Sequence, residues 1–429
     1  MPAHVHRIDH GHRAVSHGSL IVAAFSTIVE WYDFTLYLYF ATVLARVFYG
    51  SGSDALLVTL GGFAIAYLMR PLGAVFFGHI GDHHGRRYML LMSVALMTAA
   101  MLATALLPTR AAIGPAAGWL LFALRCVMGF SVGGEYTGVV AYLLEGAAPN
   151  RRGLIASSAS AASEVGALLA VGLSALTVSL MPAAALDAWG WRLPFLAGAL
   201  LAGSVGIARS AMHESPEFHR QRDEGTVPAE PLRYALTHHK GGIARAFAIS
   251  ALGSITYYVG ITYVPAFLTS AGAMSEQVSL WLSTVAAVVV IAVTPLVGLW
   301  SDRIGRRPVL LALGVLSAIL PATMFALMAS GAAAQALLGA VVLAGVAGGV
   351  SAVGAVATAE QFPGEGRVTG LALGATMATA VFGGLTPYVA QLLVERNGWT
   401  MAPGAMIAVV ALCVLPIFWL MRETAPAKP

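Results

Sequence analysis

Charged side chains are scarce in this sequence. Only 10% of its 429 residues are Asp, Glu, Lys or Arg, and 58% are hydrophobic, whereas roughly 25% charged residues is usual for a soluble domain. A soluble fold cannot bury so much apolar surface, which excludes a water-soluble enzyme or scaffold. The only two cysteines, Cys126 and Cys413, both lie in apolar stretches, so a disulfide framework is not indicated.

Signatures of catalysis are also missing. The sequence has no phosphate-binding loop, zinc-protease motif or nucleophile elbow, so neither an enzyme nor an ATP-driven pump is indicated. The histidines of the N-terminal tail lack a fixed ligand geometry and are interpreted as part of a polar tail; they are His4, His6, His10, His12 and His17. We therefore expect no catalytic residue, no metal and no cofactor.

Long apolar runs occupy most of the chain. A helix needs about 20 apolar residues to cross ~30 Å of hydrocarbon, and strand crossings would need only ~10 with an alternating pattern. The sequence therefore predicts an all-α membrane protein with twelve transmembrane helices. The expected spans are 20–48, 56–80, 89–107, 117–144, 154–180, 191–211, 245–270, 278–300, 309–329, 333–358, 368–394 and 401–421.

The distribution of Lys and Arg predicts the orientation. With both termini in the cytoplasm, the outer side would hold only Arg46, Arg110, Arg192 and Arg396. Cytoplasmic loops carry an excess of Lys and Arg, so both termini are expected inside. The formal net charge of +4 is then a feature of topology, and no nucleic-acid partner is expected.

A repeated motif divides the chain into two halves. The pattern G-x-x-x-D-x-x-G-R-R occurs between the second and third spans and again between the eighth and ninth, 220 residues later (298 − 78). Its members are Gly78, Asp82, Gly85, Arg86 and Arg87, and then Gly298, Asp302, Gly305, Arg306 and Arg307. A duplication of a six-helix unit explains this repeat. The expected parts are an N-terminal tail (1–18), a first bundle (19–211), a cytoplasmic linker (212–244), a second bundle (245–422) and a short C-terminal tail (423–429).

The paired loops resemble the signature of the major facilitator superfamily. Three further segments resemble its metabolite:proton symporter family, which includes carriers of proline and betaine, α-ketoglutarate, citrate and shikimate. These are Glu30-Trp31-Tyr32-Asp33-Phe34, Met69-Arg70-Pro71-Leu72-Gly73 and the run Gly129 to Tyr136. The resemblance implies two six-helix bundles with a central cavity between them. It also implies that the loop Asp82 lies near a helix N-terminus of the other half and pairs with Arg86 or Arg87, so that this contact gates the transporter.

Ionisable residues within the spans are the main candidates for function. Each costs ~2.5 to 3.5 kcal/mol at the bilayer centre, so each needs a partner or a water-filled cavity. All six belong to the first half: Glu30, Asp33, Arg70, Arg125, Glu135 and Glu164. We expect proton coupling at Asp33, Glu30, Arg125, Glu135 and Glu164, with the second half shaping the substrate site through neutral groups. A buried structural salt bridge is the alternative for Glu30, Asp33 and Glu164.

Helical spacing predicts which polar side chains share a face. Ser26, Glu30, Asp33 and Tyr37 follow one face of the first span, and such a stripe is expected to face a cavity. Similar stripes are Ser157, Ser160 and Glu164 in the fifth span, and Ser250, Ser254, Tyr257 and Tyr258 in the seventh. For the serines, helix packing is an equal alternative. The predicted substrate contacts are Arg125, Arg70, Tyr37, Ser160, Glu164, Tyr257 and Tyr258.

These features together predict a monomeric, proton-coupled transporter of the inner membrane that moves a small organic molecule by alternating access. Arg70 and Arg125 favour an anion, so an organic carboxylate is the first expectation and a zwitterion such as proline or betaine the second. Arg125 resembles the superfamily's coupling arginine, yet a guanidinium there could equally grip a substrate carboxylate. An exporter and a membrane sensor that does not transport remain open.

Overall fold

The computed structural model describes residues 17–84, 86–133, 151–210, 237, 239–362 and 372–425. Within these residues all regular structure is helical. The first half contains α1 His17–Tyr39, α2 Ala41–Leu44, η1 Ala45–Tyr49, α3 Ala55–Tyr67, α4 Met69–His84, α5 Arg86–Ala105, α6 Arg110–Ile113, α7 Ala116–Ser131, α9 Arg152–Leu180, α10 Ala183–Ala185, η3 Leu186–Gly190 and α11 Arg192–Ser210, where η denotes a π-helix. The second half contains α14 Lys240–Tyr257, η4 Tyr258–Thr262, α15 Val264–Ser270, α16 Glu276–Ile304, α17 Arg306–Met328, α18 Ala333–Ala359, η5 Ala372–Thr376, α20 Met377–Thr379, η6 Ala380–Leu385, α21 Thr386–Asn397 and α22 Ala402–Leu420.

The helices are long enough to cross a bilayer. Among the described residues, nine helices pass by length and hydropathy, and the pair Lys240–Thr262 and Val264–Ser270, bent by 45°, makes a tenth. The α1 helix, which carries Glu30 and Asp33, and the shorter apolar helix α7 lie at the positions predicted for the first and fourth crossings. The prediction of an all-α membrane protein is confirmed. The sixth crossing begins at Ala183, earlier than predicted, because α10 and η3 precede α11.

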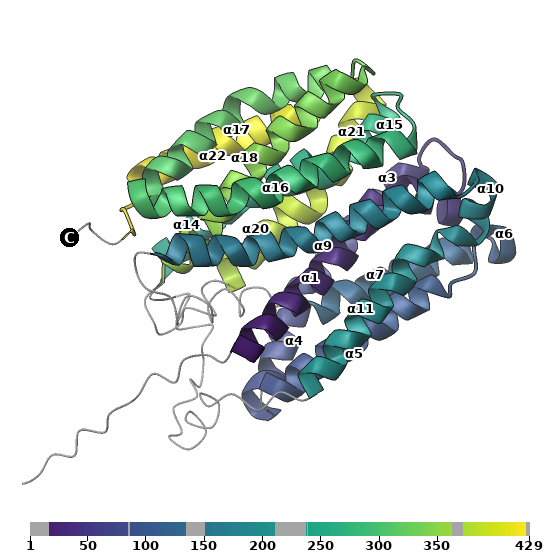
Figure 1. Cartoon of the computed structure of the whole chain (residues 1–429), viewed down its shortest axis with the longest axis horizontal. Coiled ribbons are helices and arrows are strands. Elements are labelled where there is room, and N and C mark those ends of the chain that lie inside the picture. Colours follow the sequence, from purple (N-terminus) through teal and green to yellow (C-terminus); the bar gives the residue numbers. More distant parts are fainter. Residues whose placement is uncertain are drawn as a thin grey trace, which may run out of the picture.

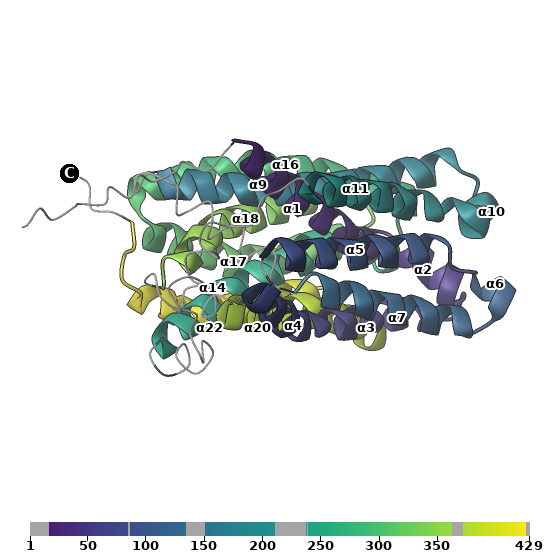
Figure 2. The same ribbon diagram turned by 90° about the horizontal axis from the view of Figure 1, so that it is seen from below.

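The two halves lie side by side with their helices along the long axis (Figures 1 and 2). In the first half, α1 packs on α9 and α11, and α7 packs on α3, α4 and α5. In the second half, α18 packs on α14, α16 and α17. Contacts between the halves run along α9 and α16 on one side, and between α3 and the η6–α21 segment on the other.

Small residues allow these helices to approach closely. A Cβ on Gly129 would lie 2.1 Å from the Ala66 carbonyl oxygen, and one on Gly133 would lie 2.2 Å from the Ala74 nitrogen. Gly129 and Gly133 are therefore positions where the absence of a side chain allows neighbouring helices to pack.

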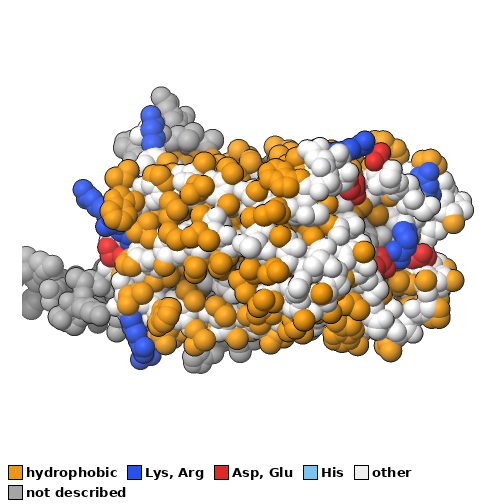
Figure 3. Space-filling model, turned by 90° about the horizontal axis from the view of Figure 1, so that it is seen from above, with side chains coloured by type: hydrophobic (Ala, Val, Ile, Leu, Met, Phe, Trp, Pro, Cys, Tyr) orange, Lys and Arg blue, Asp and Glu red, His pale blue; other side chains and the backbone are white. Residues whose placement is uncertain are grey.

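The surface of the molecule suits a bilayer. Hydrophobic side chains cover the middle of the face in Figure 3, and the Arg, Lys, Asp and Glu side chains on it gather toward the two ends. The α4–α5 and α16–α17 junctions, which carry the repeated motif, lie toward the same end as the C-terminus (Figures 1 and 2). We call this the motif end and its opposite the far end.

Ion pairs join the halves at the far end. Arg46, at the end of the first crossing, pairs with Asp187 at 2.9 Å and also with Glu276 of the second half. Arg396 of the second half pairs with Asp54 of the first at 3.2 Å. The far end is therefore closed by contacts between the halves.

Candidate functional site

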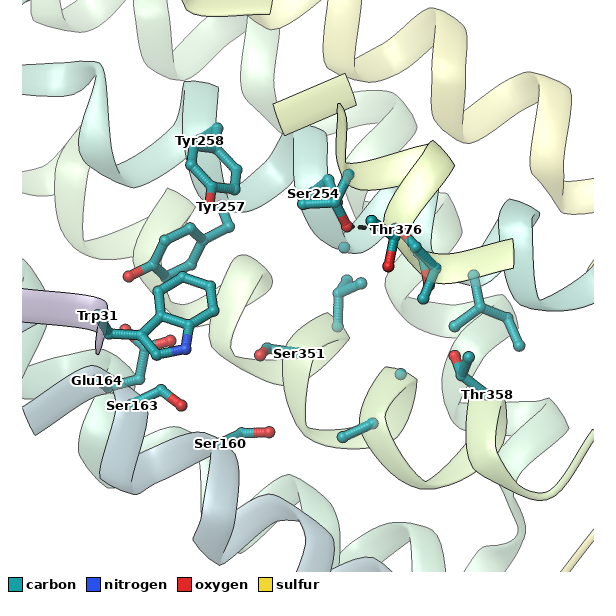
Figure 4. Close-up of a pocket in the computed structure, with 18 of the residues that line it drawn as sticks. Trp31, Ser160, Ser163, Glu164, Ser254, Tyr257, Tyr258, Ser351, Thr358 and Thr376 are labelled. Carbon is teal, nitrogen blue, oxygen red and sulfur yellow. Dashed lines mark hydrogen bonds between the residues drawn. The ribbon is translucent and has the colours of Figure 1, made fainter. Parts of the chain in front are cut away.

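A central cavity of about 180 Å³ lies between the two halves (Figure 4). It extends from Tyr67 and Tyr258 at mid-depth to Thr358 and Ala359, which form the last turn of α18 at the motif end. The hydroxyl groups of Tyr67 and Tyr258 are 2.7 Å apart and join the halves. On the side that faces the closed far end, the cavity therefore ends at this pair of tyrosines.

The first half supplies the charged part of the lining. Glu164 and its neighbours Ser160 and Ser163 come from α9, Trp31 comes from α1, and Arg70 comes from α4. The side chain of Glu164 is only 3% exposed. The helical spacing that predicted Ser160 and Glu164 on one face of the fifth span therefore agrees with their position in the cavity wall.

The second half supplies neutral groups. Its hydroxyl-bearing lining residues are Ser250, Ser254, Tyr257, Tyr258, Ser351, Thr358, Thr376 and Thr379. The Ser254 hydroxyl donates to Thr379 Oγ1 at 3.1 Å. The position of this wall agrees with the expectation that neutral groups of the second half shape the substrate site.

Arg70 is held by a dense set of contacts. Its Nη2 donates to Glu30 Oε1 at 2.6 Å, and its Nη1 donates to the Tyr67 hydroxyl at 2.6 Å. Its guanidinium also lies 4.4 Å from the centre of the Phe34 ring. Arg70 is therefore a neutralised cation at the cavity wall, connected through Tyr67 to Tyr258 of the other half.

Arg125 and Asp33 form a second buried pair. Arg125 Nη1 donates to Asp33 Oδ2 at 3.0 Å, and Nη2 donates to Thr104 Oγ1 at 3.2 Å. Arg125 is 4% exposed and Asp33 is 1% exposed. The pair lines a small cavity of about 10 Å³ together with Tyr37, inside the first half.

The location of the Asp33–Arg125 pair differs from the expected contact of Arg125 and Tyr37 with the substrate. Asp33, Arg125 and Tyr37 do not line the central cavity, so a direct substrate contact of Arg125 or Tyr37 is not supported in this conformation. Instead, Tyr37 donates to the Thr59 carbonyl oxygen at 3.0 Å. The physical reason is that α1 packs on helices of its own half through this face, and the neighbouring residue Trp31 faces the cavity instead.

Several lining residues were not predicted from the sequence. Trp31 and Ser163 adjoin predicted residues, whereas Ser351, Thr358, Thr376 and Thr379 belong to the tenth and eleventh crossings. A search for hydroxyl groups at helical spacing could have found the last four, because Ser351 and Thr358 are seven residues apart and Thr376 and Thr379 are three apart.

The second copy of the repeated motif joins the two halves. Asp302 accepts hydrogen bonds from the Gly153 and Leu154 backbone N–H groups at 2.8 and 2.9 Å. These groups open α9 of the first half, and an anion is favoured at a helix N-terminus. Asp302 also pairs with Arg306 at 2.7 Å. The contact that the resemblance implied for Asp82 is thus present at its counterpart in the second half.

Other residues of this motif stabilise the junction between α16 and α17. Gly305 has φ of +105°, which favours glycine, and the fully buried Arg306 also pairs with Glu360 at 3.4 Å. Glu423 accepts the backbone N–H groups of Arg306 and Arg307. The side chains of Asp82, Arg86 and Arg87 and the surroundings of Gly78 lie outside the described part of the chain, as do the whole of Gly85 and Glu135.

Replacement of Asp302 by Ala should open the motif end. The change removes the acceptor at the start of α9 and one of the two carboxylates that pair with Arg306, at a cost of about 1–2 kcal/mol. We expect the ratio of molecules with the motif end open to molecules with it closed to rise roughly five- to thirtyfold. The rate at which a thiol reagent labels a Thr358→Cys variant, with Cys126 and Cys413 replaced, should rise accordingly. An unchanged rate would show that the contact does not hold the conformation.

Comparison with known proteins identifies relatives across the whole chain. Residues 19–230 match the family model described as sugar (and other) transporter, and residues 246–429 match the model of the Major Facilitator Superfamily. The chain is 34% identical over 378 residues to the alpha-ketoglutarate permease of Escherichia coli, covering 87% of each protein. It is 32% identical over 420 residues to a glycine betaine/proline/ectoine/pipecolic acid transporter of Dickeya dadantii, covering 95% of this chain and 83% of the relative. It is 31% identical over 415 residues to the citrate-proton symporter of Klebsiella pneumoniae, covering 96% and 93%.

Solved structures share the same fold. A partially occluded, inward-open xylose transporter from E. coli matches with a TM-score of 0.74 at 20% identity, over 96% of this chain and 99% of that one. The proton:xylose symporter bound to 6-bromo-6-deoxy-D-glucose matches with a TM-score of 0.73 at 18% identity, over 95% and 96%. At these identities the matches establish the fold alone. The family models and the relatives at 31–34% identity place the chain in the major facilitator superfamily, as a member of its metabolite:proton symporter family.

Proposed function

We propose that the chain is a secondary active transporter that couples inward proton movement to uptake of a small organic molecule bearing a carboxylate. Substrate enters the central cavity, and the two halves rock around it. The alpha-ketoglutarate, citrate and betaine/proline transporters among the relatives are named for substrates with a carboxylate group, which supports this class.

The Asp33–Arg125 pair is the observation that carries the coupling step. It is buried, and it lies apart from the central cavity. Protonation of Asp33 would remove the charge that holds the guanidinium, leaving Arg125 free to change partners as the halves move. A proton can thus bias the conformational equilibrium without contacting the substrate.

The substrate itself is proposed in two forms. An organic carboxylate is the first candidate, because Arg70 presents a guanidinium at the cavity wall. Its charge is already balanced by Glu30, however, and this favours a second candidate, a zwitterion whose positive group would compensate Glu164.

The membrane topology belongs to the same proposal. The motif end carries Arg303, Arg306 and Arg307, which are expected in the cytoplasm, so both termini would be cytoplasmic and the protein would lie in the inner membrane. The bundles 19–211 and 245–422, joined by the segment 212–244, would act as one monomer. Transport, not catalysis, is the proposed activity.

Uptake into proteoliposomes tests the proposal. Purified protein should accumulate a labelled carboxylate, betaine or proline when the outside is acidic, and an ionophore that collapses the pH gradient should abolish this accumulation. Binding without flux would indicate a sensor, and proton-driven efflux in cells would indicate an exporter. Either result would contradict the proposal.

A further inference from the structure

Glu164 is a buried carboxylate at the wall of the central cavity. It comes from the middle of α9 and is only 3% exposed. In Figure 4 the Tyr257 hydroxyl points toward Glu164, and the Trp31 indole overlaps it in this view; all three residues line the same cavity. Glu164 is therefore grouped with aromatic residues of both halves, because Trp31 belongs to the first half and Tyr257 to the second.

Among the described residues, Glu164 differs from the other buried carboxylates of the first half in its charge partners. Glu30 pairs with Arg70, and Asp33 pairs with Arg125. Glu164 takes part in none of the salt bridges formed among the described residues. Among the described residues of the first half, two of the three buried carboxylates are thus neutralised by arginine, and the third, Glu164, lines the cavity without an arginine partner.

Such a carboxylate discriminates between substrate classes. A second anion next to it would add repulsion in a desolvated site, whereas a cation would compensate its charge. A simple organic carboxylate would bring only negative charge into the cavity. A zwitterion would bring a positive group for Glu164 together with its own carboxylate.

The aromatic surroundings fit a positive group. The Trp31 and Tyr257 rings meet edge to face, with centroids 5.2 Å apart and planes at 83°. The electron-rich faces of Trp and Tyr attract ammonium groups, including quaternary ones. Glu164 and these two rings, which we call the Glu164 corner, therefore combine a negative charge with aromatic faces.

The rest of the cavity can receive the carboxylate end. Two nitrogens of Arg70 are engaged by Glu30 and Tyr67, but a guanidinium has five N–H donors. The second half adds the hydroxyl groups of Ser254 and Thr376 (Figure 4). The lining thus offers separate groups for the two ends of a zwitterion.

We propose that the Glu164 corner binds the ammonium group of the substrate, and that the transported molecule is consequently a small zwitterion, with a primary, secondary or quaternary amine and a carboxylate. This inference rests on the proposed function for the transport step, but it concerns binding and is tested without a gradient. Glu164 is then the residue that selects zwitterions over plain carboxylates.

Matched ligand pairs provide the test. Glycine betaine and 3,3-dimethylbutanoate differ only in having nitrogen or carbon at the centre of the trimethyl group, and proline and cyclopentanecarboxylate differ in the ring amine. Binding to the full-length protein in detergent is measured at fixed pH by the change in melting temperature and by tryptophan fluorescence. We expect at least one zwitterion to bind and its anionic counterpart, which lacks the ammonium group, to bind at least about tenfold more weakly.

Variants assign the discrimination to Glu164. Glu164→Gln should lower affinity for the zwitterion about tenfold or more and should not weaken binding of the anionic counterpart, because the repulsion between the two carboxylates is removed. Glu164→Asp should retain part of the preference. Glu395→Gln removes an exposed carboxylate of α21 that accepts a hydrogen bond from Gln391 and forms no salt bridge among the described residues, and it should keep the wild-type preference. The melting temperature without ligand checks that each variant is folded.

Three results would overturn the inference. One is that no zwitterion in the panel binds, one is that the anionic isosteres without the ammonium group bind as tightly as their partners, and one is that folded Glu164→Gln retains full discrimination. Failure of the proposed function would look different, because zwitterions would still bind at the Glu164 corner while a pH gradient would drive no accumulation.

Discussion

Replacement of Asp33 by Asn is expected to abolish gradient-driven accumulation while leaving substrate exchange intact. The amide keeps the size of the side chain and cannot take up or release a proton. Substrate still reaches the central cavity, because Asp33 does not line it. The halves can then rock with substrate bound, but the proton gradient no longer biases them.

The expected effect is large. One positive charge moved inward is worth ~2.3 kcal/mol per 100 mV, enough for roughly fifty-fold accumulation. In the Asp33→Asn variant the ratio of inside to outside substrate should fall to about one. Labelled substrate trapped inside proteoliposomes should still exchange with unlabelled substrate outside. Normal accumulation in this variant would refute the assignment of Asp33.

Arg125→Ala should lose accumulation for a related reason. It leaves Asp33 ionised without a partner at a buried site, which costs about 3–5 kcal/mol when one member of a buried pair is removed. The variant should therefore also melt at a lower temperature, and Asp33→Asn combined with Arg125→Gln should recover part of that loss. Recovery of stability without recovery of accumulation would separate the structural role of the pair from its coupling role.

A side chain at Gly298 should block the closing of the motif end. A Cβ there would lie 2.0 Å from Ser157 Oγ and 2.8 Å from the Gly153 carbonyl oxygen, at the point where α16 crosses α9. Gly298→Val must push these helices apart and stretch the Asp302 hydrogen bonds to Gly153 and Leu154. Overpacking costs about 1–3 kcal/mol, so initial uptake rates should fall by about ten- to a hundredfold.

Two further variants test this explanation. Gly345→Val adds the same side chain to α18 where nothing lies within 4 Å, and it should transport at close to the wild-type rate. A smaller side chain at Gly298, Gly298→Ala, should also slow uptake. Adding Ser157→Gly to that variant removes the atoms nearest to the new Cβ, and the double variant should take up substrate faster than Gly298→Ala alone. Equal losses in the Gly298 and Gly345 variants, or no rescue, would show that the crossing is not what limits the rate.

The fold could be predicted from the sequence because the bilayer imposes a strong constraint. Apolar runs of the right length and a motif repeated at a fixed offset indicated twelve crossings in two halves, and the structure and relatives confirm this class. Element bounds were less predictable. The sixth crossing begins earlier than expected, since Ala183–Gly190 forms a short α-helix and a π-helix before Arg192, and hydropathy alone does not reveal such a break.

The site was only partly predictable. Helical spacing found Ser160, Glu164, Ser254 and Tyr257, all of which line the cavity. It also placed Asp33 and Tyr37 on one polar face, but that face lines a small cavity inside the first half and not the central cavity, because spacing does not identify the helix against which a face packs. Nor could the sequence reveal that Arg70 is balanced by Glu30, since partners 40 residues apart are brought together only by tertiary packing.

Proton movement itself is the most direct test that a buried acid apart from the substrate cavity drives transport. Proteoliposomes containing a pH-sensitive dye and no initial gradient are given a substrate identified in the uptake screen. The lumen should acidify with the wild-type protein and should not with Asp33→Asn, although that variant still exchanges labelled substrate. Equal acidification in both, or substrate entry into wild-type vesicles without any acidification, would contradict this mechanism.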